Sequence, residues 1–594
     1  MGLGSLAGCG QWLASPAVID VKNRHTSTHL SPKLLAPAAY ALAVLFSVAA
    51  VLGSFSLPAI DLDTSRAAAA FVPLRTIPHT DLNPYGANFF LQWEAEPWKV
   101  EKTLEMARDA GLGWVKQQFP WEDLELKKGV YWNDKLNVST WDKYDRIVDL
   151  ANQYGLQIIA RLDRPPDWTR QDNRYKERPP DNFDDFGDFV YDVVSHYKGR
   201  IHYYQIWNEP NVFPEWGDQP VDPAAYTRLL QIAYRRAHEA DPNVFILSAP
   251  LAQTLEESPR NMSDIKYLEA MYQNGAKDSF DILFANAYGF AFPPEDPPDP
   301  QRLNFSRVLL LRDVMVRHGD AGKAIWFNEF GWNAAPADMA PEKLKWARVS
   351  EEDQAAYTVR AIQKARREWD WAGVFCIWYF RQAGQMTPDD PAYYFRMVDV
   401  GFTPRLLYGS IKKEAEAVRT AGPGEYEVSN PALVTQGQWQ VVRDGEATGE
   451  AFLRGSEPND SLTISFDGTE IELLVRRGPT QGALLATLDG KEANQLPRDR
   501  QGRSVLDLYQ AGRTEWARVL VATELSAGRH VLRLTISPNH NPASSGQEVA
   551  VDGFVVRETE GGNRRWPLAA AGGAILVLGG LFAWRRWNGR RARA

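Results

Sequence analysis

Two short segments of this chain each place a glutamate directly after an apolar run. Glu209 lies in Trp207-Asn208-Glu209-Pro210 after the run 201–206, and Glu329 lies in Asn328-Glu329-Phe330-Gly331 after the run 324–327. Each run is typical of a strand buried in a parallel sheet. A single Asn-Glu pair usually belongs to a solvated loop, but here both pairs follow strand-like runs and both are flanked by tryptophan. Two carboxyl groups at one site are what cleavage of a glycosidic bond requires.

The elements that must position this pair alternate regularly between residues 84 and 420. Short apolar runs alternate with longer amphipathic runs, and several of the longer runs end in glycine, as helices often do. Eight such units predict a (β/α)8 barrel, an α/β fold whose active site forms at the carboxyl ends of the strands. The expected strands are 84–91, 114–119, 157–162, 202–207, 244–248, 281–287, 324–328 and 373–379.

On this count Glu209 follows the fourth strand and Glu329 ends the seventh. Strands four and seven lie on opposite sides of a closed eight-stranded barrel, so the two side chains are expected to face each other across its mouth. An open, doubly wound sheet would not bring them together.

Residues 425–557 change character. Their apolar residues recur with a period of two, and turn signals such as Asp467-Gly468 and Asp489-Gly490 separate the runs. This pattern predicts an all-β sandwich, similar to a jelly roll. The segment shows no readable site, and it either binds carbohydrate or acts as a spacer.

Two runs without charged residues predict membrane spans at 34–60 and 566–584. Five arginines follow the second run and two precede it, and Lys22, Arg24 and Lys33 precede the first. The positive-inside rule then makes 1–33 and 585–594 cytoplasmic tails and places 61–565 outside the cytoplasm, with 61–83 as a linker. The alternative for the first run is a cleaved signal peptide, for which 33 preceding residues are long.

Composition excludes some classes of function for these 594 residues. A net charge of −9 argues against a nucleic-acid partner. The only two cysteines, Cys9 and Cys376, exclude a disulfide framework, and no Cys/His cluster has metal-ligand spacing, so we expect no metal or other cofactor. The 21 tryptophans fit a carbohydrate partner, although core packing accounts for most of them.

Over about residues 84–418 the chain resembles clan A of the glycoside hydrolases, with families 39 and 5 as the nearest types. The resemblance rests on the two glutamate motifs, with weaker support from Phe119-Pro120-Trp121-Glu122 and Pro166-Asp167-Trp168. It implies retention of the anomeric configuration. Two positions depart from the clan: Lys116 stands where many members have an arginine, and Asn286-Ala287-Tyr288 stands where many have His-x-Tyr.

Charge repulsion assigns the roles within the pair. Retaining enzymes hold their two carboxyl groups about 5–5.5 Å apart, so one keeps its proton at neutral pH. The resemblance makes Glu209 this acid and base, and Glu329 the ionised nucleophile, held by Tyr288. Asn208 is expected to bind the sugar 2-hydroxyl, with a structural turn asparagine as the alternative. Trp378 is expected to pack under the sugar at the cleavage point, with a core tryptophan as the alternative. The remaining candidates for substrate contact, with structural roles as the alternative, are Lys116, Asn286, Trp121, Trp168 and Trp332.

These observations favour a membrane-anchored, extracytoplasmic retaining glycosidase that acts on β-linked oligo- or polysaccharides. Its expected partners are the substrate and the lipid bilayer, which it would meet through two spans. Two alternatives share the same residues: a transglycosylase that trims an exported polysaccharide, and a non-catalytic surface protein that binds glycans.

Overall fold

The computed structural model of the chain describes residues 75–384 and 386–558. Within these ranges, no helix is both long enough and apolar enough to cross a membrane. The predicted spans at 34–60 and 566–584, and the tails predicted at 1–33 and 585–594, lie outside the described residues.

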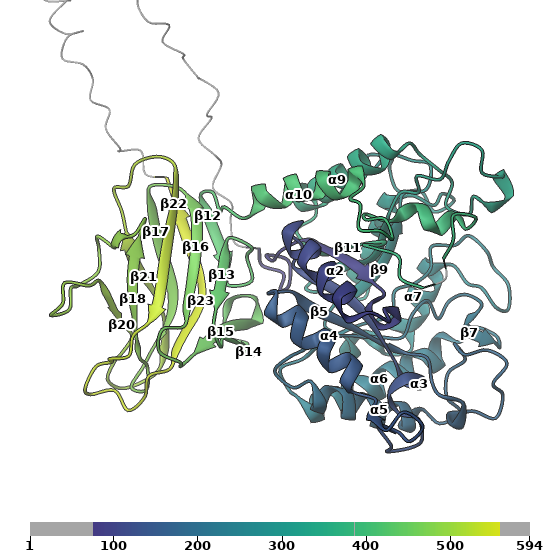
Figure 1. The fold of residues 1–594 in the computed structure, drawn as a ribbon, viewed down its shortest axis with the longest axis horizontal. Helices are drawn as coiled ribbons and strands as arrows, with labels where there is room; N and C mark the ends of the chain where they lie inside the picture. The colour runs from purple at the N-terminus through teal and green to yellow at the C-terminus, as the bar shows by residue number, and fades with distance from the viewer. Residues whose placement is uncertain (1–74, 385, 559–594) are drawn as a thin grey trace, which may run out of the picture. The chain divides into compact units, whose positions relative to one another are not determined.

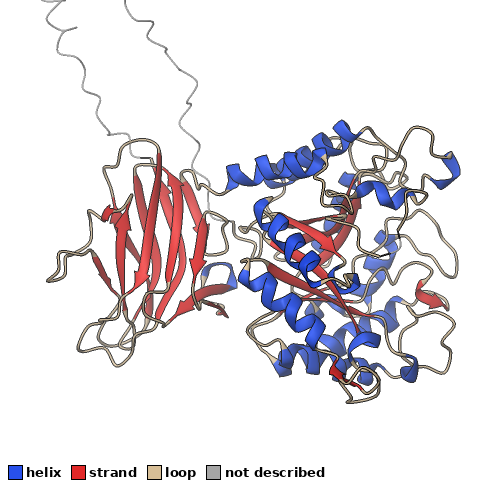
Figure 2. Cartoon of the chain, viewed as in Figure 1, coloured by secondary structure: helices blue, strands red, loops and turns tan. Residues whose placement is uncertain are grey.

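The first described part is an eight-stranded parallel barrel surrounded by helices (Figures 1 and 2). The strands run in the order β8-β6-β5-β2-β1-β11-β10-β9, and a bridge between Leu247 and Ile282 brings the two ends of this order together. The barrel expected from eight strand–helix units is therefore confirmed. The strands are β1 (Tyr85–Phe89), β2 (Trp114–Pro120), β5 (Gln157–Asp163), β6 (Tyr203–Ile206), β8 (Phe245–Leu247), β9 (Leu283–Tyr288), β10 (Ile325–Gly331) and β11 (Ala372–Ile377).

Local signals explain where the helices begin and end. Asn182, Asp222 and Ser350 each accept a hydrogen bond from a backbone N–H of the first turn, which satisfies donors that a helix leaves free. Gly111 and Gly155 follow helices with φ of 80° and 70°, a conformation that costs glycine little. The helices are α2 (Pro97–Asp109), α3 (Trp121–Leu124), α4 (Asp142–Gln153), α5 (Phe183–His196), α6 (Pro223–Ala240), α7 (Asp264–Gln273), α8 (Val308–Arg317), α9 (Glu351–Glu368) and α10 (Leu406–Val418).

Inserted segments lie on the barrel's loops. Two short strands, β3 (Trp132–Asn133) and β4 (Val138–Ser139), pair in the loop after α3, and β7 (Glu215–Asp218) follows β6. Neither insertion was predicted, because runs of two to four residues carry no periodicity.

The second part consists of two antiparallel sheets that share one hydrophobic core. Burial alternates along β16 and β22, and their inward residues pair directly, as Leu462 with Leu534 and Ile464 with Leu532. The antiparallel sheets expected from the period of two are confirmed. The strands are β12 (Gly424–Glu427), β13 (Leu433–Gln436), β14 (Gln440–Arg443), β15 (Ala451–Gly455), β16 (Ser461–Asp467), β17 (Glu470–Arg477), β18 (Ala483–Leu488), β19 (Lys491–Glu492), β20 (Val505–Asp507), β21 (Glu515–Ala522), β22 (Arg529–Ile536) and β23 (Val549–Arg557).

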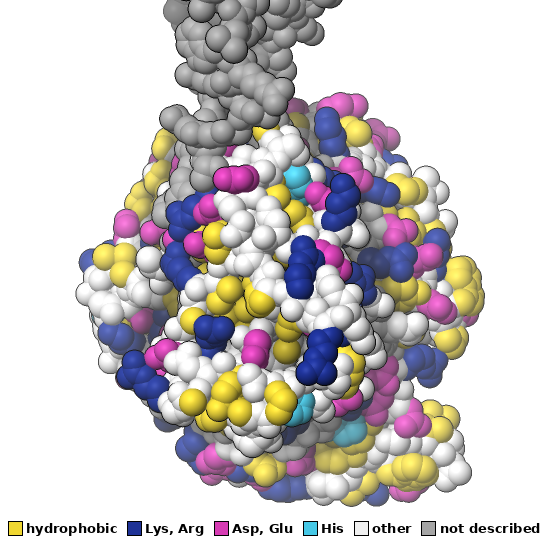
Figure 3. Space-filling model, turned by 90° about the vertical axis from the view of Figure 1, so that its left-hand side faces the viewer, with side chains coloured by type: hydrophobic (Ala, Val, Ile, Leu, Met, Phe, Trp, Pro, Cys, Tyr) yellow, Lys and Arg dark blue, Asp and Glu magenta, His cyan; other side chains and the backbone are white. Residues whose placement is uncertain are grey.

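One face of the molecule shows no concentrated charge (Figure 3). In the face that Figure 3 shows, basic, acidic and apolar side chains are interspersed. A hollow of about 250 Å³ on β18 and β22 is lined by Arg503, Arg533 and Glu492 together with aliphatic and threonine side chains, and no aromatic ring lines it. The hollow therefore offers polar groups but no stacking surface for a sugar.

Close packing of the barrel around Gly289 leads to the first prediction. A Cβ at Gly289 would lie 1.9 Å from Cε2 of Trp332, which is 1% exposed. We expect Gly289→Ala to lower the free energy of unfolding by about 3 kcal/mol, because the ring has nowhere to move. Gly322→Ala is the matched control, since nothing lies within 4 Å of its added carbon. Equal denaturant midpoints for the two variants would contradict the packing described.

Candidate active site

Glu209 lies where the chain turns over the mouth of the barrel. Trp207 and Glu209 adopt φ of 71° and 40°, a region that non-glycine residues visit at a cost of about 1–3 kcal/mol. The turn is held by two bonds: the Glu209 N–H donates to Pro250 O at 3.0 Å, and the Trp207 indole donates to Glu215 O at 2.9 Å. Such strain concentrates where a side chain must be aimed, and here it aims the Glu209 carboxyl.

Glu329 lies near the carboxyl end of β10, the seventh strand of the barrel. All seven residues of this strand are buried. The pairing of β10 with β9 shifts register between Phe327 and Glu329, so that Glu329 stands opposite Asn286. A register shift of this kind redirects the side chains beyond it. Asn88 on β1 donates to the Asn328 carbonyl at 2.9 Å and holds this strand end in place.

The Glu329 carboxylate has two polar partners. The Tyr288 hydroxyl donates to Oε2 at 2.8 Å, and Lys116 Nζ lies 3.6 Å from Oε1. Burial lowers the pKa of Lys116 to about 8, and the charge of Glu329 opposes that shift, so the ammonium remains charged at neutral pH. Burial and then Glu329 raise the pKa of Tyr288 well above its usual range, which keeps the phenol a donor. The carboxyl group of Glu329 thus has a cation beside one oxygen and a phenol donor on the other.

Glu209 has a different environment. The Asn286 amide donates to its Oε1, and Asn286 Oδ1 in turn accepts from Asn328 Nδ2 at 2.7 Å. Burial raises the pKa of Glu209 well above its ordinary value, the charges of Glu329 and Glu215 add to this, and Arg161 and Lys116 oppose it. These influences together favour the protonated form of Glu209. Asn286 also pairs with Glu329 in the β9–β10 register, so the residue that binds Glu209 is a strand neighbour of Glu329.

A third carboxylate, Glu215, was missed by the sequence reasoning. It begins β7, and its Oε2 lies 3.8 Å from Arg161 Nη2. Burial, the largest influence, together with the charges of Asp163 and Glu177 raises the pKa of Glu215 to about 7, against the opposing effects of Arg161 and of a hydrogen bond from Asn208. The only sequence signal was an acid six positions after Glu209, because nothing in the periodicity shows that this loop folds back over the mouth.

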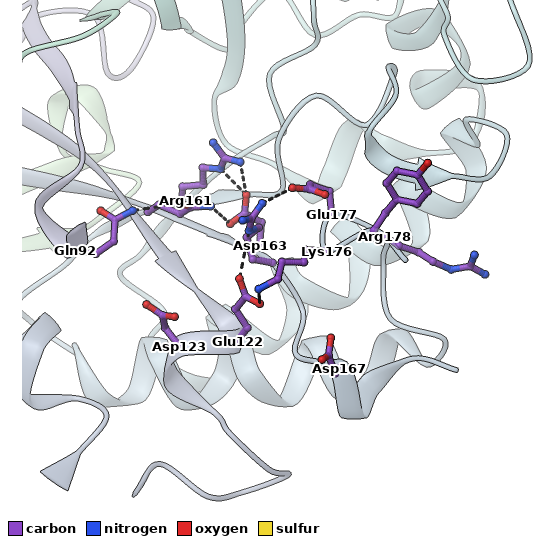
Figure 4. Close-up of polar contacts among 12 residues, drawn as sticks. Gln92, Glu122, Asp123, Arg161, Asp163, Asp167, Lys176, Glu177 and Arg178 are labelled. Atoms are coloured by element: carbon purple, nitrogen blue, oxygen red, sulfur yellow. Dashed lines mark hydrogen bonds and ion pairs between the residues drawn. The ribbon is translucent and has the colours of Figure 1, made fainter. Parts of the chain in front are cut away.

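Ion pairs hold the loop that follows β5 at one side of the mouth (Figure 4). Arg161 pairs with Asp163, and Asp163 also accepts from Gln118 Nε2 at 2.8 Å. Arg164 pairs with Glu177 and, at 3.5 Å, with Glu122. Opposite charges thus meet at close range, which fixes Arg161 between Asp163 and Glu215.

Two predicted substrate contacts, Asn208 and Trp378, carry buried polar atoms without a described partner. Asn208 is 4% exposed, and its Oδ1 has no hydrogen-bond partner among the described residues. The half-buried Trp378, which follows β11, likewise has no described partner for its indole N–H. Because buried polar atoms are nearly always paired, these two are suited to a ligand's hydroxyl groups.

The other predicted tryptophans lie elsewhere. Trp121 is fully buried and stacks on Phe189 at 5.1 Å, and Trp332 is 1% exposed with its indole donating to Phe292 O. Both therefore belong to the core, and the expectation that they contact substrate is corrected: their rings fill space between barrel and helices. Trp168 is half-buried, donates to Glu125 O at 3.1 Å and packs edge-on against Trp121.

Within residues 75–384 and 386–558, no three His, Cys, Asp or Glu side chains are grouped as a metal ion would need.

Comparison with known proteins gives structural neighbours only. No family model and no curated protein matches the chain. A family 39 glycoside hydrolase from Bacteroides cellulosilyticus WH2 is 16% identical with a TM-score of 0.45, covering 78% of this chain and 82% of its own. A glucosidase from Croceicoccus marinus is 12% identical (TM-score 0.44; 81% and 97% covered). A β-xylosidase from Caulobacter crescentus CB15 is 14% identical (TM-score 0.41; 78% and 98% covered).

The position of Glu215 predicts an electrostatic effect on Glu209. Because the Glu215 charge raises the pKa of Glu209, Glu215→Gln should lower that pKa while still accepting a hydrogen bond from Asn208. Difference infrared titration of the carboxyl bands, with Glu209→Gln to assign the band, measures it. Asp167→Asn is the control, since that side chain is 75% exposed. A Glu209 pKa that stays the same or rises in Glu215→Gln would refute the coupling.

Proposed function

We propose that this chain is a retaining glycoside hydrolase that cleaves β-glycosidic bonds by double displacement. The observation that carries the proposal is the unequal environment of two neighbouring carboxyl groups. Glu329 has a cation and a phenol as partners, whereas Glu209 has a neutral amide and a raised pKa. Two carboxyl groups whose environments separate their protonation states are the signature of an acid and a nucleophile.

In the first step Glu329 attacks the anomeric carbon and forms an ester with it. The bond to the leaving oxygen breaks, its electron pair stays on that oxygen, and Glu209 donates its proton there. The Asn286 amide occupies Glu209 Oε1, which leaves the other carboxyl oxygen for the proton and the leaving group. Glu209 becomes ionised at this point, and Arg161 and Lys116 stabilise the new charge.

In the second step Glu209 acts as base. It takes a proton from water as the water oxygen attacks the anomeric carbon, and Glu329 leaves as a carboxylate. Lys116 and Tyr288 stabilise that carboxylate, since they contact separate oxygens of it. Two inversions at one carbon leave its configuration unchanged.

The hydrogen-bonded position of Asn286 supports retention over inversion. Asn286 donates to Glu209, and its backbone pairs with that of Glu329 in the β9–β10 register, so the two glutamates are linked through one residue. Direct attack needs a separation of about 5–5.5 Å, whereas an inverting enzyme needs a wider gap, about 6.5–9.5 Å, to admit a water.

Substrate contacts follow from the unused polar atoms. With the Asn208 amide donating to Glu215, the Asn208 Oδ1 is left to accept from a sugar hydroxyl. Trp378 supplies a ring face and an indole N–H beside the point of cleavage. Both contacts strengthen the hold on the sugar at which bonds change.

Azide rescue tests the two roles. Glu209→Gln and Glu329→Gln should each lose most turnover of aryl β-glycosides. For Glu209→Gln we expect turnover to fall by about a thousandfold when the leaving group needs protonation. With an activated aryl leaving group, which departs without protonation, azide should restore activity to the Glu209 variant and give the β-glycosyl azide, because it replaces the second-step water. In the Glu329 variant it should give the α-azide, because it enters from the nucleophile's face.

Glu416→Gln, on the exposed face of α10, is the control and should keep full activity. Azide products of the opposite configuration would mean that the two roles are exchanged. Undiminished turnover in both variants, or no turnover of any aryl glycoside by the unaltered enzyme, would contradict the proposed function and favour a glycan-binding protein.

We further propose that the barrel lies outside the cytoplasm, held by membrane spans at 34–60 and 566–584. The support is in the sequence: both runs lack charged residues, and Arg585, Arg586, Arg590, Arg591 and Arg593 follow the second. Such a location suits an enzyme of exported or external glycans.

Protease accessibility tests this location. Protease added to intact spheroplasts should digest residues 61–565, because the positive-inside rule places them on the outer side. A cytoplasmic reporter expressed in the same cells should survive until the membrane is broken. If the barrel also survives until that point, the orientation is wrong, and a role on exported glycans falls with it.

A further inference from the structure

One exposed tryptophan lies at the mouth of the barrel without an assigned role. Among the described residues the large exposed tryptophans are Trp93, Trp98 and Trp132, at 52%, 55% and 43% exposure. Trp93 ends the short helix η1 (Leu91–Trp93), which begins two residues after β1 at the carboxyl end of the barrel. Trp98 instead lies in the first turn of α2, and Trp132 in the β3–β4 hairpin.

Trp93 continues the aromatic surface that begins at Trp378. Phe90 stacks on Trp93 with ring centres 5.0 Å apart and planes within 7°. Phe90 also meets the Trp378 ring edge-on at 5.6 Å. Trp378, Phe90 and Trp93 thus contact one another in a row, from the half-buried Trp378 to the exposed Trp93, and this row is called the aromatic shelf below.

Hydrogen bonds hold the short segment that carries Trp93 in place. The Leu91 N–H donates to Gln117 Oε1 at 3.0 Å, and Gln117 Nε2 donates to Gln92 Oε1. Gly384 lies against the ring from another loop, since a Cβ there would come within 2.9 Å of Trp93 Cε3. A ring held in advance loses little conformational entropy when a ligand stacks on it.

The order of strands shows on which side of the cleaved bond the shelf lies. β1, which carries Phe90 and leads into η1, is next to β11 and three strands away from β6, after which Glu209 stands. The acid lies on the side of the leaving group, because it protonates the leaving oxygen. The shelf therefore lies on the other side, beyond the sugar that Glu329 attacks.

We propose that Trp93 is the platform for a second sugar ring on the non-leaving side of the cleaved bond. This rests on the proposed function and narrows its substrate class. The preferred substrates are β-linked chains. The fragment that becomes attached to Glu329 contains at least two sugars and is then released with a new reducing end, and release of single sugars is disfavoured. The apolar face of a pyranose on an indole ring supplies the contact.

Paired chromogenic substrates test the platform. The probes are 4-nitrophenyl β-glucoside, β-xyloside and β-mannoside, each compared with its matching β-1,4-linked disaccharide glycoside. For the sugar that the enzyme accepts, kcat/KM should be at least about tenfold higher for the disaccharide, chiefly through KM. Trp93→Ala should remove this advantage and leave the monosaccharide rate unchanged, while Trp93→Phe should retain part of it.

Trp98→Ala is the matched control, because Trp98 is equally exposed but lies outside the mouth. A disaccharide advantage that persists in Trp93→Ala, or a preference for monosaccharide probes in the unaltered enzyme, would overturn the platform while leaving the glycosidase intact. Absence of turnover on all six probes would instead count against the proposed function, and the platform would fall with it.

Discussion

The burial of two carboxyl groups at one end of the barrel is the constraint on which the site depends. Charges there lose hydration, and two of the same sign repel each other strongly. The two groups have different partners: Glu329 contacts Lys116 and Tyr288, whereas Glu209 accepts a hydrogen bond from the neutral amide of Asn286. Two carboxylates and two cations act on the pKa of Glu209 in opposite directions, and burial, the largest influence, raises it.

The hydrogen-bond chain from Asn328 through Asn286 to Glu209 links the two motifs directly. Asn328 precedes Glu329 on β10, and its amide donates to Asn286 on β9, which in turn donates to Glu209 beyond β6. A small displacement of one strand end would therefore be felt at both carboxyl groups. This explains why the strand ends are themselves tied, as Asn88 on β1 ties the Asn328 carbonyl.

The aromatic residues divide into two classes by position. Trp121 and Trp332 pack between the barrel and its helices, whereas Trp378, Phe90 and Trp93 follow strands β11 and β1 at the mouth. Residue type alone does not separate these classes, because an indole ring fills a core as well as it supports a sugar. The two classes differ in the position of the ring: it is either packed between the barrel and its helices or follows a strand end at the mouth.

The sequence by itself determined the eight strand–helix units, the second part with a period of two, and the two strand-end glutamates, because these follow from local periodicity and short motifs. Tertiary structure alone decided that Glu215 returns to the mouth through β7, that Arg161 lies between Asp163 and Glu215, and that Trp93 joins Trp378 through Phe90. These contacts join residues from different loops, whose paths depend on packing. Local sequence patterns record which residues a strand buries, but not where a loop between two strands comes to rest.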